Sequence, residues 1–103
     1  MASGTLGRAV LTSGNTSVLY TVPISKIATM NLNVVNRGAN AALLRVALST
    51  SNTASDSEWI EYNTTISSSG VLERTGLVAS ANTRVLVYSS VNDVTATVYG
   101  YEE

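Results

Sequence analysis

The residues of this chain that could perform chemistry are few, and they are mainly carboxylates and arginines. Three of its seven acidic residues, Asp56, Glu58 and Glu61, lie close together in the sequence. Neighbouring carboxylates of this kind can cleave glycosidic bonds or bind calcium. However, strand alternation places Glu58 and Glu61 on opposite faces, and Asp56 does not fit the spacing of an EF-hand loop. We therefore expect these three residues to form a solvated polar rim.

The sequence contains no His and no Cys. A Ser-His-Asp triad, a thiolate nucleophile, a zinc finger and an iron–sulfur site are therefore excluded. The glycines near the N-terminus are followed by neither a helix nor a Lys-Ser/Thr pair, so they do not form a phosphate-binding loop. The sequence thus predicts that the protein is not an enzyme, and it indicates no metal and no cofactor.

The chain is polar without being strongly charged. Charged residues make up 13% of its 103 residues, whereas there are 14 Ser, 13 Thr and 9 Asn. The net charge is −1 and the six basic residues are scattered, so we expect no nucleic-acid partner. The longest apolar runs are far shorter than the roughly 20 residues that a membrane helix needs, so we expect no membrane partner.

Hydrophobic residues recur with a period of two, which is typical of half-buried β-strands. The clearest example is the segment from Ala28 to Val34, where apolar and mostly polar residues alternate. Turn signals rich in Gly, Asn and Ser divide the chain at intervals that predict an all-β fold, a single antiparallel, jelly-roll-like β-sandwich over residues 1–103. The eight expected strands lie near 5–12, 17–22, 27–36, 42–50, 58–65, 70–78, 83–90 and 94–101.

Three local features are expected within this sandwich. Segments 27–36 and 42–50 are predicted to form one long hairpin, closed by a loop in which Gly38 can take a positive φ. The run from Val85 to Tyr88 is apolar on both faces, which favours a central strand. Residues 1–12 are predicted to form an N-terminal arm or an edge strand.

The candidate binding residues are arginines and aromatics. Arg is enriched at protein interfaces because its planar guanidinium forms bidentate pairs, and Trp and Tyr are common anchors. Trp59 directly follows the polar loop Ser51–Ser57 and is the best candidate for an exposed anchor. The aromatic residues could also stack on a sugar or pack in and beside the core, and both alternatives stay open. The candidate interface residues are Trp59, Arg37, Arg45, Arg74, Arg84, Tyr62 and Tyr101.

Several segments resemble small structural proteins of tailed bacteriophages. The run from Leu19 to Thr29, LYTVPISKIAT, resembles a phrase of the form LYTVPxGKxAxx. Ser25 stands where the phrase usually has Gly, so we expect this turn to differ in backbone conformation. The resemblance covers nearly the whole chain, and none of its motifs is catalytic. Its further segments are Asn36-Arg37, Leu44 to Leu48, Glu61-Tyr62, Gly70 to Gly76 and Val98 to Glu103.

The resemblance implies a compact β-sandwich that is made in the bacterial cytoplasm and carried in many copies on the virion. It favours a capsid decoration or cement protein that stabilises the head shell. Its implied partners are the major capsid protein and further copies of itself, with a homotrimer favoured. The alternative is a structural or receptor-binding module of the tail, baseplate or fibre, including one that binds carbohydrate. Neutral Ser, Thr and Asn faces suit contacts that depend little on salt, and sheet edges suit pairing with a neighbouring strand.

Overall fold

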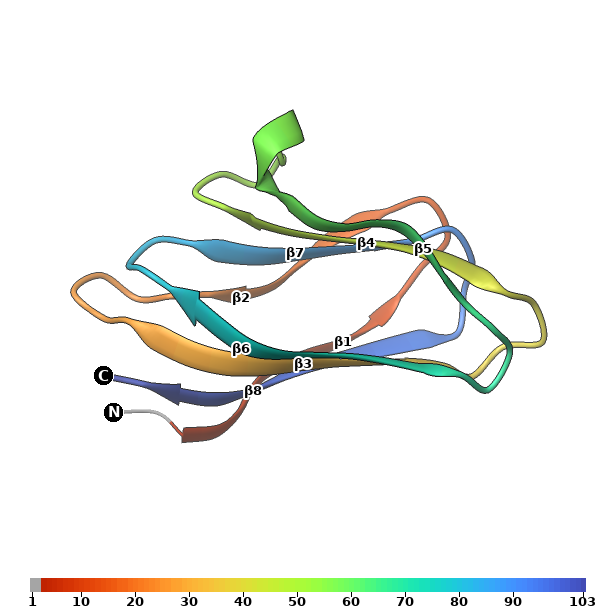
Figure 1. Ribbon diagram of the computed structural model, residues 1–103, viewed down its shortest axis with the longest axis horizontal. Helices are drawn as coiled ribbons and strands as arrows, with labels where there is room; N and C mark the ends of the chain where they lie inside the picture. Colours follow the sequence, from red (N-terminus) through yellow and green to blue (C-terminus); the bar gives the residue numbers. More distant parts are fainter. Residues whose placement is uncertain (1–2) are drawn as a thin grey trace.

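The computed structural model describes residues 3–103, which form eight β-strands and one short 3-10 helix, η1 (Figure 1). All eight strands predicted from the period-two pattern are present, and their ends differ from the predicted ends by two residues at most. The elements are β1 (Ser3–Leu11), β2 (Thr16–Thr21), β3 (Ala28–Asn36), β4 (Ala42–Ser49), η1 (Asp56–Glu58), β5 (Trp59–Ile66), β6 (Val71–Ala79), β7 (Arg84–Ser89) and β8 (Val94–Glu102).

The strands form two four-stranded antiparallel sheets packed face to face (Figure 1). The first, which we call sheet I, has the order β1-β8-β3-β6, and the second, sheet II, has the order β2-β7-β4-β5. The predicted all-β sandwich is therefore confirmed. β7, which contains the run from Val85 to Tyr88, is an inner strand of sheet II, as its apolar character on both faces predicted.

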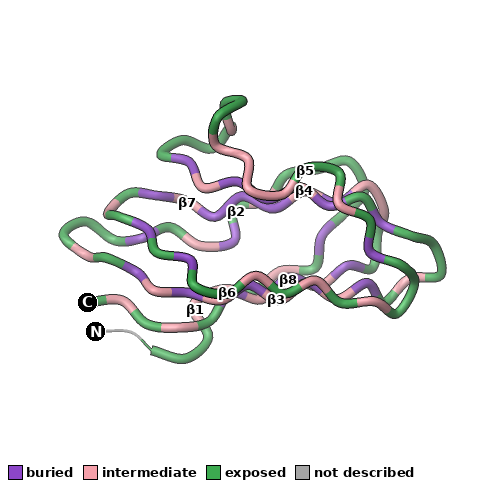
Figure 2. Tube along the Cα trace, in the orientation of Figure 1, coloured by how far each residue is buried: buried purple, intermediate pink, exposed green. Residues whose placement is uncertain are grey.

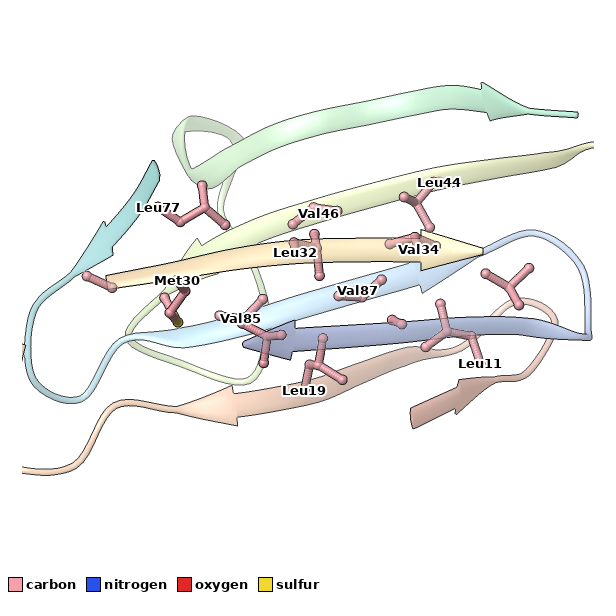
Figure 3. Packing of buried hydrophobic residues seen from close by; sticks show 14 of the residues in the cluster. Leu11, Leu19, Met30, Leu32, Val34, Leu44, Val46, Leu77, Val85 and Val87 are labelled. Atoms are coloured by element: carbon pink, nitrogen blue, oxygen red, sulfur yellow. The ribbon is translucent and has the colours of Figure 1, made fainter. Parts of the chain in front are cut away.

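The hydrophobic core lies between the two sheets, and buried residues line the inner side of both (Figures 2 and 3). The alternation of β3 is the clearest, because every second residue from Ala28 to Asn36 is buried. Its side chains meet those of β4 and β7 from the opposite sheet. Among the core residues, those labelled in Figure 3 are Leu11, Leu19, Met30, Leu32, Val34, Leu44, Val46, Leu77, Val85 and Val87. The core is built from aliphatic side chains, which leaves Trp59 outside it.

The predicted hairpin between segments 27–36 and 42–50 is wrong. β3 pairs with β6 and β8 in sheet I, whereas β4 pairs with β5 and β7 in sheet II. The connecting loop crosses from one sheet to the other, and Gly38 does not take the positive φ that a tight turn was expected to need. The period-two pattern identifies which side of a strand is buried, but both sheets bury a side in the same core.

The buried side chain of Asn36 organises this crossover. Its amide nitrogen donates hydrogen bonds to the carbonyl oxygens of Asn40 at 2.8 Å and Ile66 at 3.1 Å, and its oxygen accepts one from the backbone N–H of Gly38 at 3.0 Å. Asn36 therefore satisfies backbone groups of the crossover loop and of the end of β5 at once, which explains a fully buried polar residue in this position.

The edge strands differ from the inner strands in regularity. The pairings β3–β8 and β4–β7 keep a continuous register, whereas all four edge strands, β1, β2, β5 and β6, shift register against their inner neighbours. Residues 3–11 form edge strand β1, so of the two predicted alternatives for the N-terminal segment the structure has the edge strand. Residues 1 and 2 of that segment lie outside the described residues.

Ser25 lies in the turn before β3 with a φ of 65°, in the left-handed region that favours glycine. The turn closes through the backbone N–H of Lys26, which donates to the carbonyl of Pro23 at 3.2 Å. A residue with a Cβ atom at this position is mildly strained.

Candidate functional site

Four side chains gather on the outer face of sheet II, and three of them were predicted interface residues. The guanidinium carbon of Arg45 lies 4.4 Å from the ring centroid of Tyr62 and 4.7 Å from that of Tyr88. Trp59 approaches Tyr62 edge-on, with ring centroids 5.4 Å apart and an interplanar angle of 70°. We call these residues, Arg45, Trp59, Tyr62 and Tyr88, the Arg45 cluster.

Strand register explains why these residues meet. Arg45 on β4 points outward, because Leu44 and Val46 on either side of it are core residues, and it lies opposite Tyr88 on β7. On its other side, the register between β4 and β5 shifts, so that Tyr62 and Asn63 together oppose Arg45. Asn63 has a φ of 53°, and its side-chain oxygen accepts a hydrogen bond from Arg45 Nε at 2.7 Å. This bulge in β5 therefore holds the guanidinium in place.

A polar loop of residues 50–58, which includes η1, lies over the neighbouring part of sheet II (Figure 1). Ala47 and Leu86 are completely buried there, although they are neighbours in register on the outer side of the sheet, and Trp59 lies next to Ala47 in the same row. Trp59 and the loop thus form a small second layer of packing outside the main core.

Hydrogen bonds fix this loop at both ends. Arg84 donates from Nη1 to the carbonyl of Thr50, and Glu58 accepts a hydrogen bond from the backbone N–H of Ser55 at 2.8 Å. The hydrogen bond from Ser55, followed by one from the hydroxyl of Ser49, lowers the pKa of the half-buried Glu58 carboxyl. The carboxylate is therefore used to hold the loop in shape.

A shallow cavity of about 240 Å³ lies between this loop and the Arg45 cluster. Its size suits a single sugar ring or one amino-acid side chain of a partner. Within residues 3–103 the one ion pair is Arg74–Glu61, so no carboxylate of this region neutralises Arg45. The cluster therefore offers aromatic faces and a preoriented cation to a partner. The cavity is lined by Gly14, Thr16, Arg45, Asn52, Thr53, Ala54, Trp59 and Tyr88.

The acidic residues near the loop do not assemble a reaction centre. Glu61 on β5 pairs with Arg74 and accepts a hydrogen bond from Thr64 at 2.7 Å, while Glu58 is bonded within the loop. The strand placement expected for Glu58 is wrong, because this residue lies in η1 before β5 begins. In the part of the chain that the structure describes, no three carboxylates lie close enough to hold a metal ion.

The remaining predicted interface residues lie apart from the cluster. Arg74 on β6 reaches across to Glu61 on β5 and so joins the free edges of the two sheets, and Arg84 holds the loop. Arg37 donates from Nε to the hydroxyl of Thr95 at 2.9 Å on sheet I, and Tyr101 is exposed on the same sheet. Sequence reasoning did not select Tyr88 as an interface residue. Its position next to a buried apolar run indicated a strand but not the register that places it beside Arg45.

A larger cavity of about 310 Å³ lies among the loops at one end of the sandwich. Its lining includes one acidic residue, Asp93, and no cation or aromatic ring. Two of these loops are joined here, because the hydroxyl of Ser13 donates a hydrogen bond to the carbonyl of Ser90 at 2.8 Å. The cavity therefore offers less for recognition than the Arg45 cluster does.

Comparison with known proteins adds no family to this description. No protein-family model matches the sequence, and no curated protein matches it significantly. Within residues 3–103, no helix has the length and apolar character needed to cross a membrane.

Proposed function

We propose that this protein is a non-enzymatic structural component of a phage virion, a decoration or cement protein that binds the major capsid protein through the Arg45 cluster. The observation that carries this proposal is the cluster itself. Arg, Trp and Tyr are the residue types that dominate binding energy at protein interfaces, and here four of them are held together on one outward face. The virion setting is supported by the full-length resemblance to small phage structural proteins.

The chemistry of the site supports binding without catalysis. Arg45 is positioned by two aromatic rings and by Asn63, so it loses little side-chain freedom when a partner binds. An exposed carboxylate or carbonyl on a shell subunit would be a suitable acceptor for its remaining N–H groups. Two carboxylates of this region, Glu61 and Glu58, are already bonded within the chain, to Arg74 and to the backbone N–H of Ser55.

Antibody labelling of purified particles tests the virion setting, and label on the heads is the expected result. A shell-binding experiment then tests the site, with Arg45→Ala and Tyr62→Ala compared with Ile24→Ala, a change at an exposed turn residue away from the cluster. We expect the first two variants to lose at least about tenfold in affinity and the control to bind normally. Absence of label on both heads and tails would overturn the proposal.

The cavity beside Trp59 supports a second candidate, a carbohydrate-binding module of the tail or fibre. An indole next to Arg45 and Asn52 can stack on the apolar face of a sugar while polar groups bind its hydroxyls. A glycan array with the wild type and Trp59→Ala separates the candidates. Binding that disappears in the variant supports the sugar function, and identical weak binding by both proteins counts against it.

A further inference from the structure

The irregular sheet edges favour self-association through a face. Each edge strand is interrupted by a register shift, and Gly4 in β1 and Gly76 in β6 have φ values of 96° and 71°. Such breaks disrupt the row of free N–H and C=O groups that an added strand requires. The outer face of sheet II carries the loop and η1 (Figure 1). The outer face of sheet I carries no such covering segment among residues 3–103.

The outer face of sheet I is composed of small polar and apolar side chains in regular rows. Three of its valines, Val10, Val71 and Val78, are 61%, 54% and 62% exposed. No side chain of the rows is long except those of the two tyrosines, Arg8 and Glu73. Following the register from β1 to β6, the rows are Ser3, Tyr101, Thr29 and Val78; Thr5, Tyr99 and Asn31; Arg8, Thr97, Asn33 and Glu73; and Val10, Thr95, Val35 and Val71.

The charges on this face are arranged in opposite pairs about its centre. Arg8 on β1 and Glu73 on β6 stand in the same row at opposite edges of the sheet. Beyond the last row, Arg37 follows β3 and Asp93 precedes β8, and the N–H of Arg37 donates to the carbonyl of Asp93 at 2.9 Å. Within the described chain none of these four residues takes part in an ion pair. The face and its end therefore present two cations and two anions that have no ion-pair partner within the described chain, although Arg8 and Arg37 donate hydrogen bonds to the hydroxyls of Thr5 and Thr95.

A two-fold axis parallel to the strands and midway between β8 and β3 makes this pattern complementary to itself. It places β1 of one copy over β6 of the other, and β8 over β3, while each row stays over the same row. Arg8 then faces Glu73 of the second copy, and Arg37 faces Asp93 of the second copy. An axis across the strands would place β1 over β1, which contains no acidic residue to face Arg8. The charges thus select one orientation.

Apolar contacts and area agree with this orientation. Exposed Val10 then faces exposed Val71 of the second copy, and Thr97 faces the amide of Asn33. Four strands of nine residues, spaced about 4.8 Å apart, cover roughly 570 Å². Two copies would bury about 1,100 Å², just above the ~1,000 Å² that a specific interface needs.

We propose that the outer face of sheet I binds a second copy of this chain about a two-fold axis parallel to its strands, with Arg8 against Glu73 and Arg37 against Asp93. This pairing goes beyond the proposed function, because it depends on sheet I alone and leaves the Arg45 cluster of both copies free. A two-fold pair also replaces the trimer that the phage resemblance favours, since a face that binds itself closes after two copies.

Analytical ultracentrifugation of the full chain over a range of concentrations tests the pairing. We expect a monomer–dimer equilibrium for the wild type. Arg8→Glu and Glu73→Arg each set like charges against each other twice, and each should weaken dimerisation by about tenfold or more at low salt. The double variant Arg8→Glu/Glu73→Arg restores opposite charges and should recover the wild-type affinity. Asp56→Arg on η1 is the matched control, with the same charge change as Glu73→Arg but off the face, and it should dimerise normally.

Any other result of the ultracentrifugation experiment would overturn the proposed pairing. A wild type that stays monomeric at all concentrations has no such interface, and a trimer requires a different one. Equal dimerisation of all variants, or failure of the double variant to recover, would show that Arg8 does not face Glu73. Thermal unfolding by circular dichroism confirms that each variant is folded. Particle labelling reads out the proposed function separately, so the two proposals can fail independently.

Discussion

The two outer faces of this sandwich are built differently, although the same core lies beneath both. On sheet II, Trp59 and the loop of residues 50–58 bury Ala47 and Leu86, so that part of the face belongs to the fold. On sheet I, the outer side chains remain exposed or half-buried. Truncating Trp59 in the packed layer on sheet II should therefore reduce stability, whereas truncating an outward side chain on sheet I should leave stability nearly unchanged.

The largest loss of stability is expected in sheet I at Gly100, where the backbones of β8 and β3 lie in close contact. A Cβ atom on Gly100 would lie 2.1 Å from the carbonyl oxygen of Thr29, and Gly100 has a φ of 150°. Gly100→Ala should separate β8 from β3 and cost about 3 kcal/mol in the free energy of unfolding, measured by urea titration. Gly14→Ala is the control, because its φ is 78° with open space around the Cβ position, and it should cost only about 1 kcal/mol. Equal losses in the two variants would contradict the close-contact explanation.

The next largest effect compares the stability contributions of one aromatic residue on each outer face. Trp59→Ala removes the cover over Ala47 and Leu86 and should lower the free energy of unfolding by about 2 kcal/mol. Tyr101→Ala removes an aromatic ring from sheet I that is 42% exposed, and it should change stability by about 0.5 kcal/mol or less. If the two variants were equally stable, Trp59 would not be part of a second packing layer.

The difference between the faces also shows what the sequence could predict. The alternation of β3 predicted which of its residues are buried, because the core removes every second side chain from water. The same alternation could not assign β3 and β4 to different sheets, since both sheets share one core. The crossover between the sheets is held by Asn36, whose hydrogen bond to Ile66 is a contact over 30 residues without a sequence signature.

The candidate site was predictable in residue type but not in arrangement. Arg45, Tyr62 and Trp59 were selected because their chemistry suits interfaces. Their convergence with Tyr88 depends on the bulge at Asn63, a polar residue in the left-handed region whose position in β5 gave no sign of a register shift. The rows of sheet I likewise follow from register, so the pairing of Arg8 with Glu73 was not visible in the sequence.

A smaller effect tests the loop on sheet II. The pKa of Glu58 is lowered chiefly by the backbone N–H of Ser55, so its carboxylate stabilises the loop above its ordinary pKa of 4.5. This stabilisation is lost as the pH falls through the lowered pKa. Since Trp59 is the only Trp of the chain and follows Glu58 directly, its fluorescence should shift on acidification. Glu58→Gln should show the acid spectrum already at neutral pH, and an unshifted spectrum would contradict this role.

The smallest effect is the loss, at high pH, of a side-chain contact that joins the two sheets. The hydroxyl of Tyr20 on β2 donates to the carboxylate of Glu102 on β8, and burial, followed by this hydrogen bond and the negative charge, raises the pKa of Tyr20 to about 12. An unfolded tyrosine ionises near pH 10, so the contribution of this contact is complete below pH 10 and is lost between pH 10 and about 12. The urea midpoint of the wild type should fall over this range. Tyr20→Phe should start lower and fall less, because it has no proton to lose, and parallel curves for the two proteins would mean that Tyr20 does not couple the sheets.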